Sequence, residues 1–337
     1  MNKLRGERMK KKILWCFVLV GVFLLSGCGK GEQDIIKKLN DKVNKSKSYY
    51  ITGELEIINN EDTYKYDTEV SYKEENQFKV LLKNKTNNHE QIILRNSDGV
   101  YVLTPSLNKS FKFQSEWPYN SSQSYLLQII VKDINSDAER TVEKINNEYV
   151  ITTKVDYSNN EELKKQKIYI NSDANISKVE VLDDKENVKI RMNYNNIDLN
   201  ATFDDNYFKL ENSMKTSTGV DETVSNIDEV IFPMYVPDNT YLSKQDKVFL
   251  DNGERVILTF AGDKPFTMVQ ETVKGDKNVT VVPTGELEII TDSVGYVSDQ
   301  SVSWISNGIE YYVSSSALTQ KELIDVAKSM SVMPVGK

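Results

Sequence analysis

Residues 51–72, ITGELEIINNEDTYKYDTEVSY, contain two runs in which large apolar or aromatic side chains occupy every second position. The alternating set is Ile51, Leu55, Ile57, Tyr64, Tyr66, Val70 and Tyr72. Asn59 and Asn60 separate the two runs and are typical turn residues. Because successive side chains of a strand point to opposite faces, this pattern predicts an antiparallel hairpin with one buried face.

The same alternation continues along the chain and predicts about ten consecutive antiparallel strands. Beyond the first hairpin, the expected strands are 78–82, 92–94, 100–103, 141–145, 149–157, 167–170, 176–182 and 187–194. Two amphipathic helices interrupt the series, one around 35–43 and one over Ser121–Asp133, capped by Ser121 or Ser122. A sheet of this length curves, and the two helices are the available cover for its concave side.

The C-terminal part of the chain predicts a smaller unit with antiparallel strands and one helix. The expected strands are 249–250, 256–260, 266–273, 287–290, 301–306 and 309–313. Asn307-Gly308 predicts a tight turn between the last two strands. Thr319 and Glu322 form a capping box, in which each side chain satisfies a backbone N–H group of the other residue at the start of a helix.

Glycine and proline divide the chain into two parts. Residues 32–218 contain two Gly and two Pro, whereas residues 219–337 contain eight Gly and five Pro. The polar stretch between the parts is typical of a linker. We therefore predict an α+β protein with a large curved-sheet domain over 35–211, a linker over 212–230 and a small α+β domain over 231–337.

The first 27 residues have the features of an export signal. A basic stretch precedes Ile13–Leu25, which is uncharged but too short to span a bilayer as a helix. The following Ser26-Gly27-Cys28 resembles a bacterial lipobox. This resemblance implies cleavage between Gly27 and Cys28, acylation of Cys28 and a short tether over 28–34. We expect a protein anchored by acyl chains to the extracytoplasmic face of the cell membrane.

Charge and cysteine content exclude several classes of function. The whole chain has 42 basic and 50 acidic residues, and removal of the signal takes away six basic and one acidic residue, giving a net charge of −13. A protein this acidic lacks the basic face of a nucleic-acid binder. The mature chain keeps only Cys28, so no disulfide forms. The common hydrolase, P-loop, zinc-protease and EF-hand motifs do not occur, and we predict no catalytic residues, no metal site and no cofactor.

An aromatic segment is the main candidate for binding. Phe111, Phe113, Trp117 and Tyr119 occur at or near alternate positions. Aromatic side chains beside a groove are frequent anchors for a ligand or partner. The alternative, which we favour, is that they cover the open side of the curved sheet. The only histidine, His89, lies in a polar run and is predicted to occupy a solvated turn.

Beyond these patterns, the chain resembles a family of bacterial lipoproteins. The resemblance depends on the lipobox, the order of helix and strands, the segment YVLTPSLNKSFKF at 101–113, and Trp117-Pro118. Residues 35–210 resemble the LolA-like lipoproteins of spore-forming Firmicutes, the YdcC- and GerS-related group. Val236-Pro237-Asp238, Ser303-Trp304 and the last helix resemble the small domain written DUF4367. The resemblance implies an unclosed antiparallel β half-barrel with helices in its concavity.

The resemblance also implies a function. We expect a non-enzymatic binding or scaffold role in sporulation or spore germination, with a protein partner of the cell envelope such as a cortex amidase. One alternative is a carrier that holds a lipid, an acyl chain or a lipoprotein in the apolar half-barrel. A second alternative is an envelope-stress sensor of the RseB type.

Overall fold

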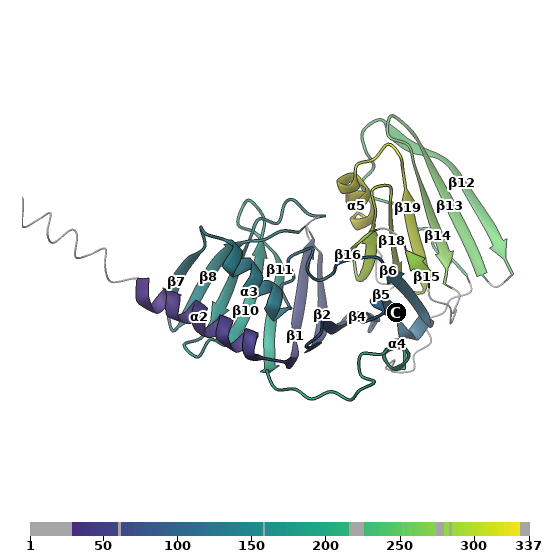
Figure 1. The fold of residues 1–337 in the computed structure, drawn as a ribbon. Coiled ribbons are helices and arrows are strands. Elements are labelled where there is room, and N and C mark those ends of the chain that lie inside the picture. Colours follow the sequence, from purple (N-terminus) through teal and green to yellow (C-terminus); the bar gives the residue numbers. More distant parts are fainter. Residues whose placement is uncertain are drawn as a thin grey trace, which may run out of the picture.

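The computed structural model describes residues 29–59, 62–157, 159–215, 226–251, 253–273, 280–282 and 285–330. They form two β-sheets that lie next to each other (Figure 1). The predicted signal, residues 1–27, and Cys28 lie outside the described residues. Helix α2 (Gly29–Lys45) begins directly after them, so residues 29–34 of the predicted tether belong to a helix.

The first sheet contains twelve strands in the order β15-β6-β5-β4-β3-β2-β1-β11-β10-β9-β8-β7. Its strands are β1 (Ser48–Asn59), β2 (Asp62–Lys73), β3 (Gln77–Asn84), β4 (Glu90–Asn96), β5 (Gly99–Thr104), β6 (Lys109–Phe113), β7 (Thr141–Ile145), β8 (Glu148–Lys154), β9 (Lys165–Ile170), β10 (Ile176–Leu182), β11 (Val188–Asp198) and β15 (Thr280–Val282). Neighbours pair antiparallel, except that β15 runs parallel to β6. Among the described strands the two ends of the sheet do not meet, so the predicted unclosed antiparallel half-barrel is confirmed.

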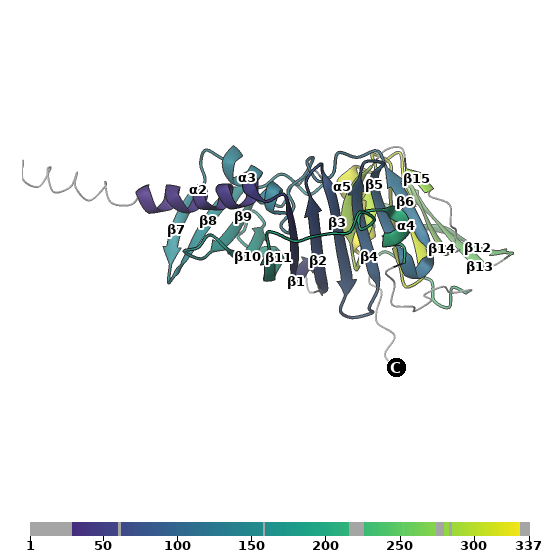
Figure 2. The same ribbon diagram turned by 60° about the horizontal axis from the view of Figure 1, so that its bottom comes forward.

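Two helices cover the β7–β11 half of the concave face (Figures 1 and 2). Leu39 of α2 and Ile130 of α3 (Leu127–Ser136) are buried in one core with Leu55 of β1. The predicted helical cover is therefore confirmed for this half of the sheet. The predicted start of the second helix at Ser121 is wrong, because Ser122 is tied to Asp156 by N–H···O bonds of 2.7 and 2.9 Å and does not cap the helix.

The second sheet has seven strands in the order β12-β13-β14-β19-β18-β17-β16. Its strands are β12 (Thr240–Leu250), β13 (Gly253–Gly262), β14 (Phe266–Thr272), β16 (Glu286–Ile290), β17 (Ser293–Val297), β18 (Ser301–Ser306) and β19 (Ile309–Ser314). Helix α5 (Gln320–Lys328) packs on one face, and the predicted Thr319–Glu322 capping box is present. The sequence did not predict β15 or β17, nor the first nine residues of β12. Strand β12 is exposed on both faces, so its sequence has no apolar alternation.

The second sheet covers the β3–β6 half of the concave face. Val294 of β17 and Ile305 of β18 are buried in the core of the first sheet. The rings of Phe111 and Phe113 on β6 lie 6.3 and 5.7 Å from the ring of Tyr296. One face of the second sheet therefore completes the apolar core of the first sheet, while the other face packs with α5 in a core of its own.

The chain leaves β11 and crosses the convex face of the first sheet. Phe208 packs there in a separate cluster with Ile92, Leu94, Tyr101 and Leu103. The short helix α4 (Leu210–Ser213) follows, and Met214 contacts the same cluster. After the residues that are not described, Ile227 is already buried in the core of the second sheet. The described parts of residues 212–230 thus pack against the two sheets.

Candidate functional site

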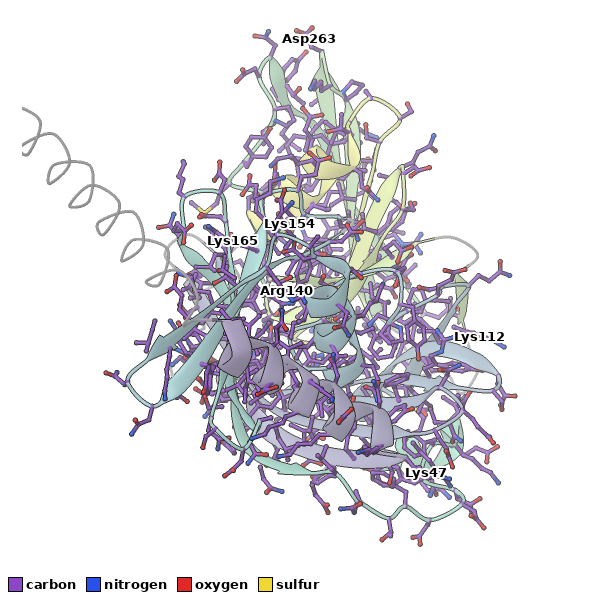
Figure 3. All side chains as sticks on the ribbon, turned by 60° about the vertical axis from the view of Figure 1, so that its left-hand side comes forward. Lys47, Lys112, Arg140, Lys154, Lys165 and Asp263 are labelled. Carbon is purple, nitrogen blue, oxygen red and sulfur yellow. The ribbon has the colours of Figure 1, made fainter. Side chains whose placement is uncertain are left out.

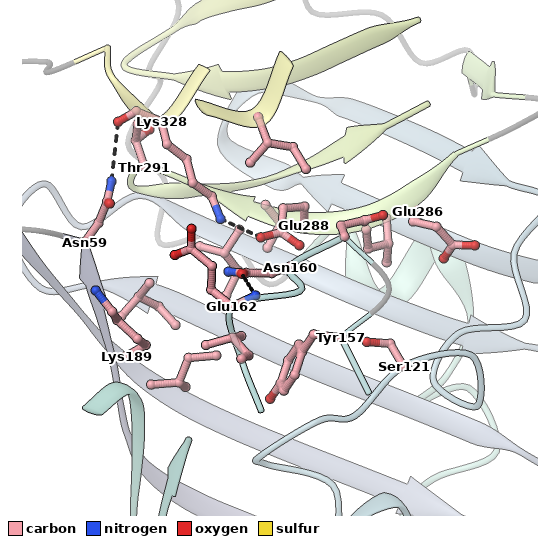
Figure 4. Close-up of a pocket in the computed structure, with 18 of the residues that line it drawn as sticks. Asn59, Ser121, Tyr157, Asn160, Glu162, Lys189, Glu286, Glu288, Thr291 and Lys328 are labelled. Carbon is pink, nitrogen blue, oxygen red and sulfur yellow. Dashed lines mark hydrogen bonds and ion pairs between the residues drawn. The ribbon is translucent and has the colours of Figure 1, made fainter. Parts of the chain in front are cut away.

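A cleft of about 840 Å³ lies where the two covers of the concave face meet. Its apolar lining includes Leu55, Ile57, Tyr64, Ile93, Trp117, Leu163, Ile190, Ile289 and Ile324. Its charged lining comprises Glu161, Glu162, Lys189, Glu286, Glu288, Lys321, Asp325 and Lys328. We call this space the seam cleft (Figure 4). Both sheets, α5, and the loops 117–125 and 157–163 contribute to it, so the cleft exists only when the two sheets are docked.

Trp117 is held at the apolar floor by contacts from the first sheet. Trp117 is 2% exposed, and its ring lies edge-on to the ring of Phe78, with ring centroids 6.0 Å apart. The guanidinium of Arg95 donates to the carbonyl oxygens of Glu116 and Trp117. Lys132 of α3 donates to the carbonyl oxygen of the nearby Tyr119 at 2.7 Å. These bonds fix the loop backbone, so Trp117 forms a rigid part of the cleft.

The rim of the cleft joins the two sheets through α5. Lys328 forms an ion pair of 2.6 Å with Glu288 of β16, and both side chains are largely buried. The Asn59 amide of β1 donates to the Lys328 carbonyl oxygen at 3.4 Å. Figure 4 shows both interactions on the same side of the cleft. The C-terminal end of α5 is thus fastened both to its own sheet and to the half-barrel.

Negative charge is in excess around the cleft, with five carboxylates and three ammonium groups among the lining residues. Lys321 lies 3.3 Å from Glu162 and 3.0 Å from Asp325, so it is shared between two carboxylates. Glu286 accepts a hydrogen bond from the Asn120 amide. Burial raises the pKa of Glu286, and the nearby Glu116 carboxylate raises it further. The cleft therefore combines an apolar floor with an acidic rim.

The structure separates the four predicted aromatic residues. Phe111 and Phe113 are buried beneath the second sheet, and Trp117 lines the seam cleft. Tyr119 is half-buried and donates its hydroxyl to Asn76 at 2.6 Å. Only Trp117 of the four therefore lines the cleft, whereas Phe111 and Phe113 belong to strand β6 and are themselves covered by the second sheet. The predicted lipidation residue, Cys28, lies outside the described residues.

The prediction that His89 occupies a solvated turn is wrong. His89 is 3% exposed. Its backbone N–H donates to Asn87 Oδ1 at 3.0 Å, and the Asn87 amide donates to Asp292 Oδ2 of the second sheet at 3.0 Å. The turn is polar in sequence but is covered by a segment about 200 residues later in the chain, which sequence reasoning did not anticipate.

Two kinds of feature are absent from residues 29–330 outside the gaps in the described chain. Within this part, no group of three or more His, Cys, Asp or Glu side chains could hold a metal ion. No helix in the same part is long and apolar enough to cross a membrane.

The cleft and most of its lining residues could not be predicted from the sequence. Glu286, Glu288 and Lys328 lie in strand and helix patterns that carry no sign of a site. Asn120 and Asn160 lie in two polar loops, and no pattern in either loop indicates that both line one cleft. Trp117 is the one predicted binding residue that lines the cleft, and the aromatic pattern of residues 111–119 indicated it.

Comparison with known proteins gives the family. The model of a family described as "Sporulation protein YdcC-like" matches residues 9–208. The chain is 35% identical to "Sporulation protein YdcC" of Bacillus subtilis (strain 168), over 98% of each chain. Among solved structures, it is similar to one of the Pseudomonas aeruginosa MucA/MucB complex (11% identity, TM-score 0.32, covering 88% of this chain and 98% of that chain).

A second solved structure is that of the CwlD amidase from Clostridioides difficile in complex with the GerS lipoprotein. It matches with 19% identity and a TM-score of 0.31, covering 49% of this chain and 94% of that chain. The family assignment depends on the two sequence matches, of which the first spans more than half of the chain and the second nearly all of it. The chain therefore belongs to the YdcC-like family of sporulation proteins.

Proposed function

We propose that this chain is a membrane-tethered binding protein of spore formation or germination, which holds a segment of an envelope protein in the seam cleft. The observation that carries the proposal is the cleft itself, with its apolar floor and charged rim between the two sheets. A concave site with an apolar lining and a few oriented polar groups is typical of binding sites. The work of such a protein requires a shaped surface and no catalytic residue.

Two further lines support the developmental stage and the kind of partner. The Bacillus subtilis relative is named a sporulation protein, and its similarity covers nearly the whole chain. The resemblance of residues 35–210 to GerS-related lipoproteins favours a cell-wall enzyme, such as a cortex amidase, as the partner. In this arrangement the chain positions the enzyme at the membrane, and the enzyme supplies the chemistry.

The tether is the second part of the proposal. Lipidated Cys28 would directly precede α2, because that helix begins at Gly29. A diacylated or triacylated cysteine anchors a protein stably, whereas a single acyl chain does not. The seam cleft would then lie outside the cell membrane, where envelope enzymes act.

Site-specific crosslinking in sporulating cells tests the cleft. A photoreactive phenylalanine analogue replaces Tyr64, which is half-buried in the cleft lining. The matched control carries the same analogue at Tyr312, which is 38% exposed on β19 and does not line the cleft. We expect a crosslinked envelope protein from the Tyr64 variant alone, identified by mass spectrometry. Equal adducts at both positions, or none at either, would contradict the proposal.

The same experiment distinguishes the lipid carrier. The apolar floor also suits an acyl chain, and in that case the adduct at Tyr64 is a lipid. Native mass spectrometry of residues 29–337 then shows extra mass that denaturation removes. A lipid adduct without a protein adduct would replace the proposed function with the carrier.

Lipidation is tested by substitution of the two cysteines. We expect Cys28→Ala to abolish labelling by radioactive palmitate. Cys16→Ala is the matched control, because Cys16 lies in the apolar run of the signal and is removed by the predicted cleavage. Retention of label in Cys28→Ala would reject Cys28 as the anchor.

A further inference from the structure

Strand β12 forms an open edge of the second sheet. It is the last strand in the sheet order, and it pairs only with β13 among the described strands. All of its residues from Tyr241 to Phe249 are exposed except Asp246, which is half-buried. Figure 3 places Asp263, at the end of the β12–β13 pair, at the opposite end of the molecule from Lys47, which follows α2. Figure 1 places β12 and the start of α2 at opposite ends of the molecule, so the edge is accessible and remote from the predicted tether.

Exposed apolar side chains are concentrated at this edge. Of the nine exposed large apolar residues in the described chain, seven lie between Phe232 and Phe249, and four of these are on β12. Those four are Tyr241 (63% exposed), Leu242 (40%), Val248 (41%) and Phe249 (76%). An unpaired strand edge that also exposes apolar side chains is a template for pairing with another strand.

The charges on β12 select the partner strand. Lys244 and Asp246 lie on the same face, because their side chains form an ion pair of 2.8 Å. If two copies of β12 pair antiparallel with Gln245 opposite Gln245, Lys244 of each copy faces Asp246 of the other. The same register brings the apolar ends of the two strands together, with Tyr241 and Leu242 of one copy near Val248 and Phe249 of the other. Opposite charges and apolar pairs across strands are each stabilising.

The backbone allows this register. In an antiparallel strand, alternate residues direct both N–H and C=O to the same edge, so outward-directed residues must face outward-directed residues. The positions paired in this register add up to 490, and an even sum always pairs residues of the same parity. Moving the twofold axis to Lys244 or Asp246 would place like charges opposite each other. The bulge that separates Leu242 from Lys244 lies outside the central triplet.

We propose that β12 is a self-association edge, through which two copies of this chain form a twofold dimer with one continuous sheet. A twofold interface is isologous, so the same strand serves both partners. The proposal does not depend on the seam cleft or on the proposed function. Membrane tethering would favour the dimer by raising the local concentration of the chain.

Charge reversal tests the register. The probe is the chain from Gly29 to Lys337, measured by sedimentation equilibrium. We expect a dimer for the unaltered chain, and a dissociation constant at least about tenfold higher for Asp246→Lys and for Lys244→Asp. Combining both substitutions in one chain exchanges the two charges, and this variant should dimerise as the unaltered chain does. An equimolar mixture of the two single variants should form the heterodimer, because one then carries two lysines and the other two aspartates.

The control is Asp299→Lys, which makes the same change in net charge at an exposed residue before β18. It should dimerise normally. A monomeric unaltered chain at high micromolar concentration would overturn the proposal. A dimer that the single reversals do not weaken, or that the double exchange does not restore, would also overturn the proposed register. Circular dichroism of each variant establishes that a loss of dimer is not a loss of fold.

Discussion

The two halves of the concave face are covered by different means. Over β7–β11, the helices α2 and α3 supply apolar side chains, and Leu39 and Ile130 are almost fully buried. Over β3–β6, the cover is the second sheet. The buried Gln91 side chain of β4 is hydrogen-bonded to both the N–H and the C=O of Val294 on β17, which lies 203 residues farther along the chain than Gln91. The helical cover is bonded to the sheet through side chains such as Gln128, which accepts from Tyr49, whereas the second cover is also bonded at the backbone of the incoming strand, which fixes its alignment.

The two kinds of contact contribute differently to the free energy of unfolding and to the alignment of each cover on the sheet. Apolar burial is roughly proportional to area and has no preferred direction, so the helical cover contributes mostly to the free energy of unfolding. Hydrogen bonds between a buried side chain and a strand backbone contribute less but require one alignment. Because the seam cleft lies between the two covers, its volume depends on the apolar cover and its shape depends on the hydrogen-bonded one.

The largest expected effect comes from the helical cover. Ile130→Ala removes a fully buried side chain from α3 and leaves a cavity against β1 and its neighbours. We expect the free energy of unfolding to fall by about 2–5 kcal/mol, measured by urea denaturation. Lys37→Ala, on the exposed side of α2, is the control and should change it by less than about 0.5 kcal/mol. Equal, small effects would mean that the helices do not stabilise the sheet.

The next largest effect is a dependence of the free energy of unfolding on pH, caused by Asp133 in the helical cover. Burial raises the pKa of Asp133 on α3 to about 6, against the opposing effects of Ser122, Lys132 and Gln166. The folded state therefore binds this proton more tightly than the unfolded state, and the free energy of unfolding should fall as pH rises from about 4 to about 6. The expected loss is about 2–3 kcal/mol.

Asp133→Asn should remove this dependence, because the amide does not ionise. The measurement is urea denaturation at intervals between pH 4 and pH 7 for both chains. Asp173→Asn, in an exposed turn, is the matched control and should keep the slope of the unaltered chain. If Asp133→Asn keeps the slope as well, another group is responsible.

The hydrogen-bonded cover should show a smaller and more local effect. Gln91→Ala leaves the buried N–H and C=O groups of Val294 without their side-chain partner, which we expect to cost about 1–3 kcal/mol. Hydrogen exchange should become faster at Val294 and in β17 but not in α3. The exposed Gln300→Ala serves as the control. Unchanged exchange at Val294 would show that apolar contacts alone hold the second sheet.

The sequence predicted the elements whose partners are local. The predicted 141–145 strand has the observed bounds of β7, and the turn residues Asn146 and Asn147 connect it to β8. Alternation and turn residues determine such hairpins within about twenty residues of chain. The Thr319–Glu322 capping box is likewise a local interaction.

What the sequence did not predict depends on distant parts of the chain. Strand β15 pairs with β6, about 170 positions earlier, and only three of its residues do so. The burial of His89 and the placement of Gln91 both follow from the docking of the second sheet. The hydrophobic periodicity around residues 89–91 gives no indication of a contact with the second sheet. The seam cleft could not be predicted for the same reason, since each of its walls has a different origin in the sequence.

The smallest effect should come from the ion pair that closes the rim of the cleft. Lys328 and Glu288 lie 2.6 Å apart with side chains 21% and 16% exposed. A double-mutant cycle with Lys328→Met and Glu288→Gln should give a coupling energy of about 0.5–1 kcal/mol, decreasing as salt is raised from about 0.05 to 1 M. The Asn59 bond to the Lys328 carbonyl oxygen remains in every variant, because it involves only the backbone of residue 328. A measurable coupling energy would mean that the ion pair between Lys328 and Glu288 helps to fix the position of α5 on the second sheet. A coupling of zero at low salt would instead mean that the position of α5 beside the cleft is set by its apolar face and by Asn59, and the contrast between the two covers would then be limited to Gln91 and its neighbours.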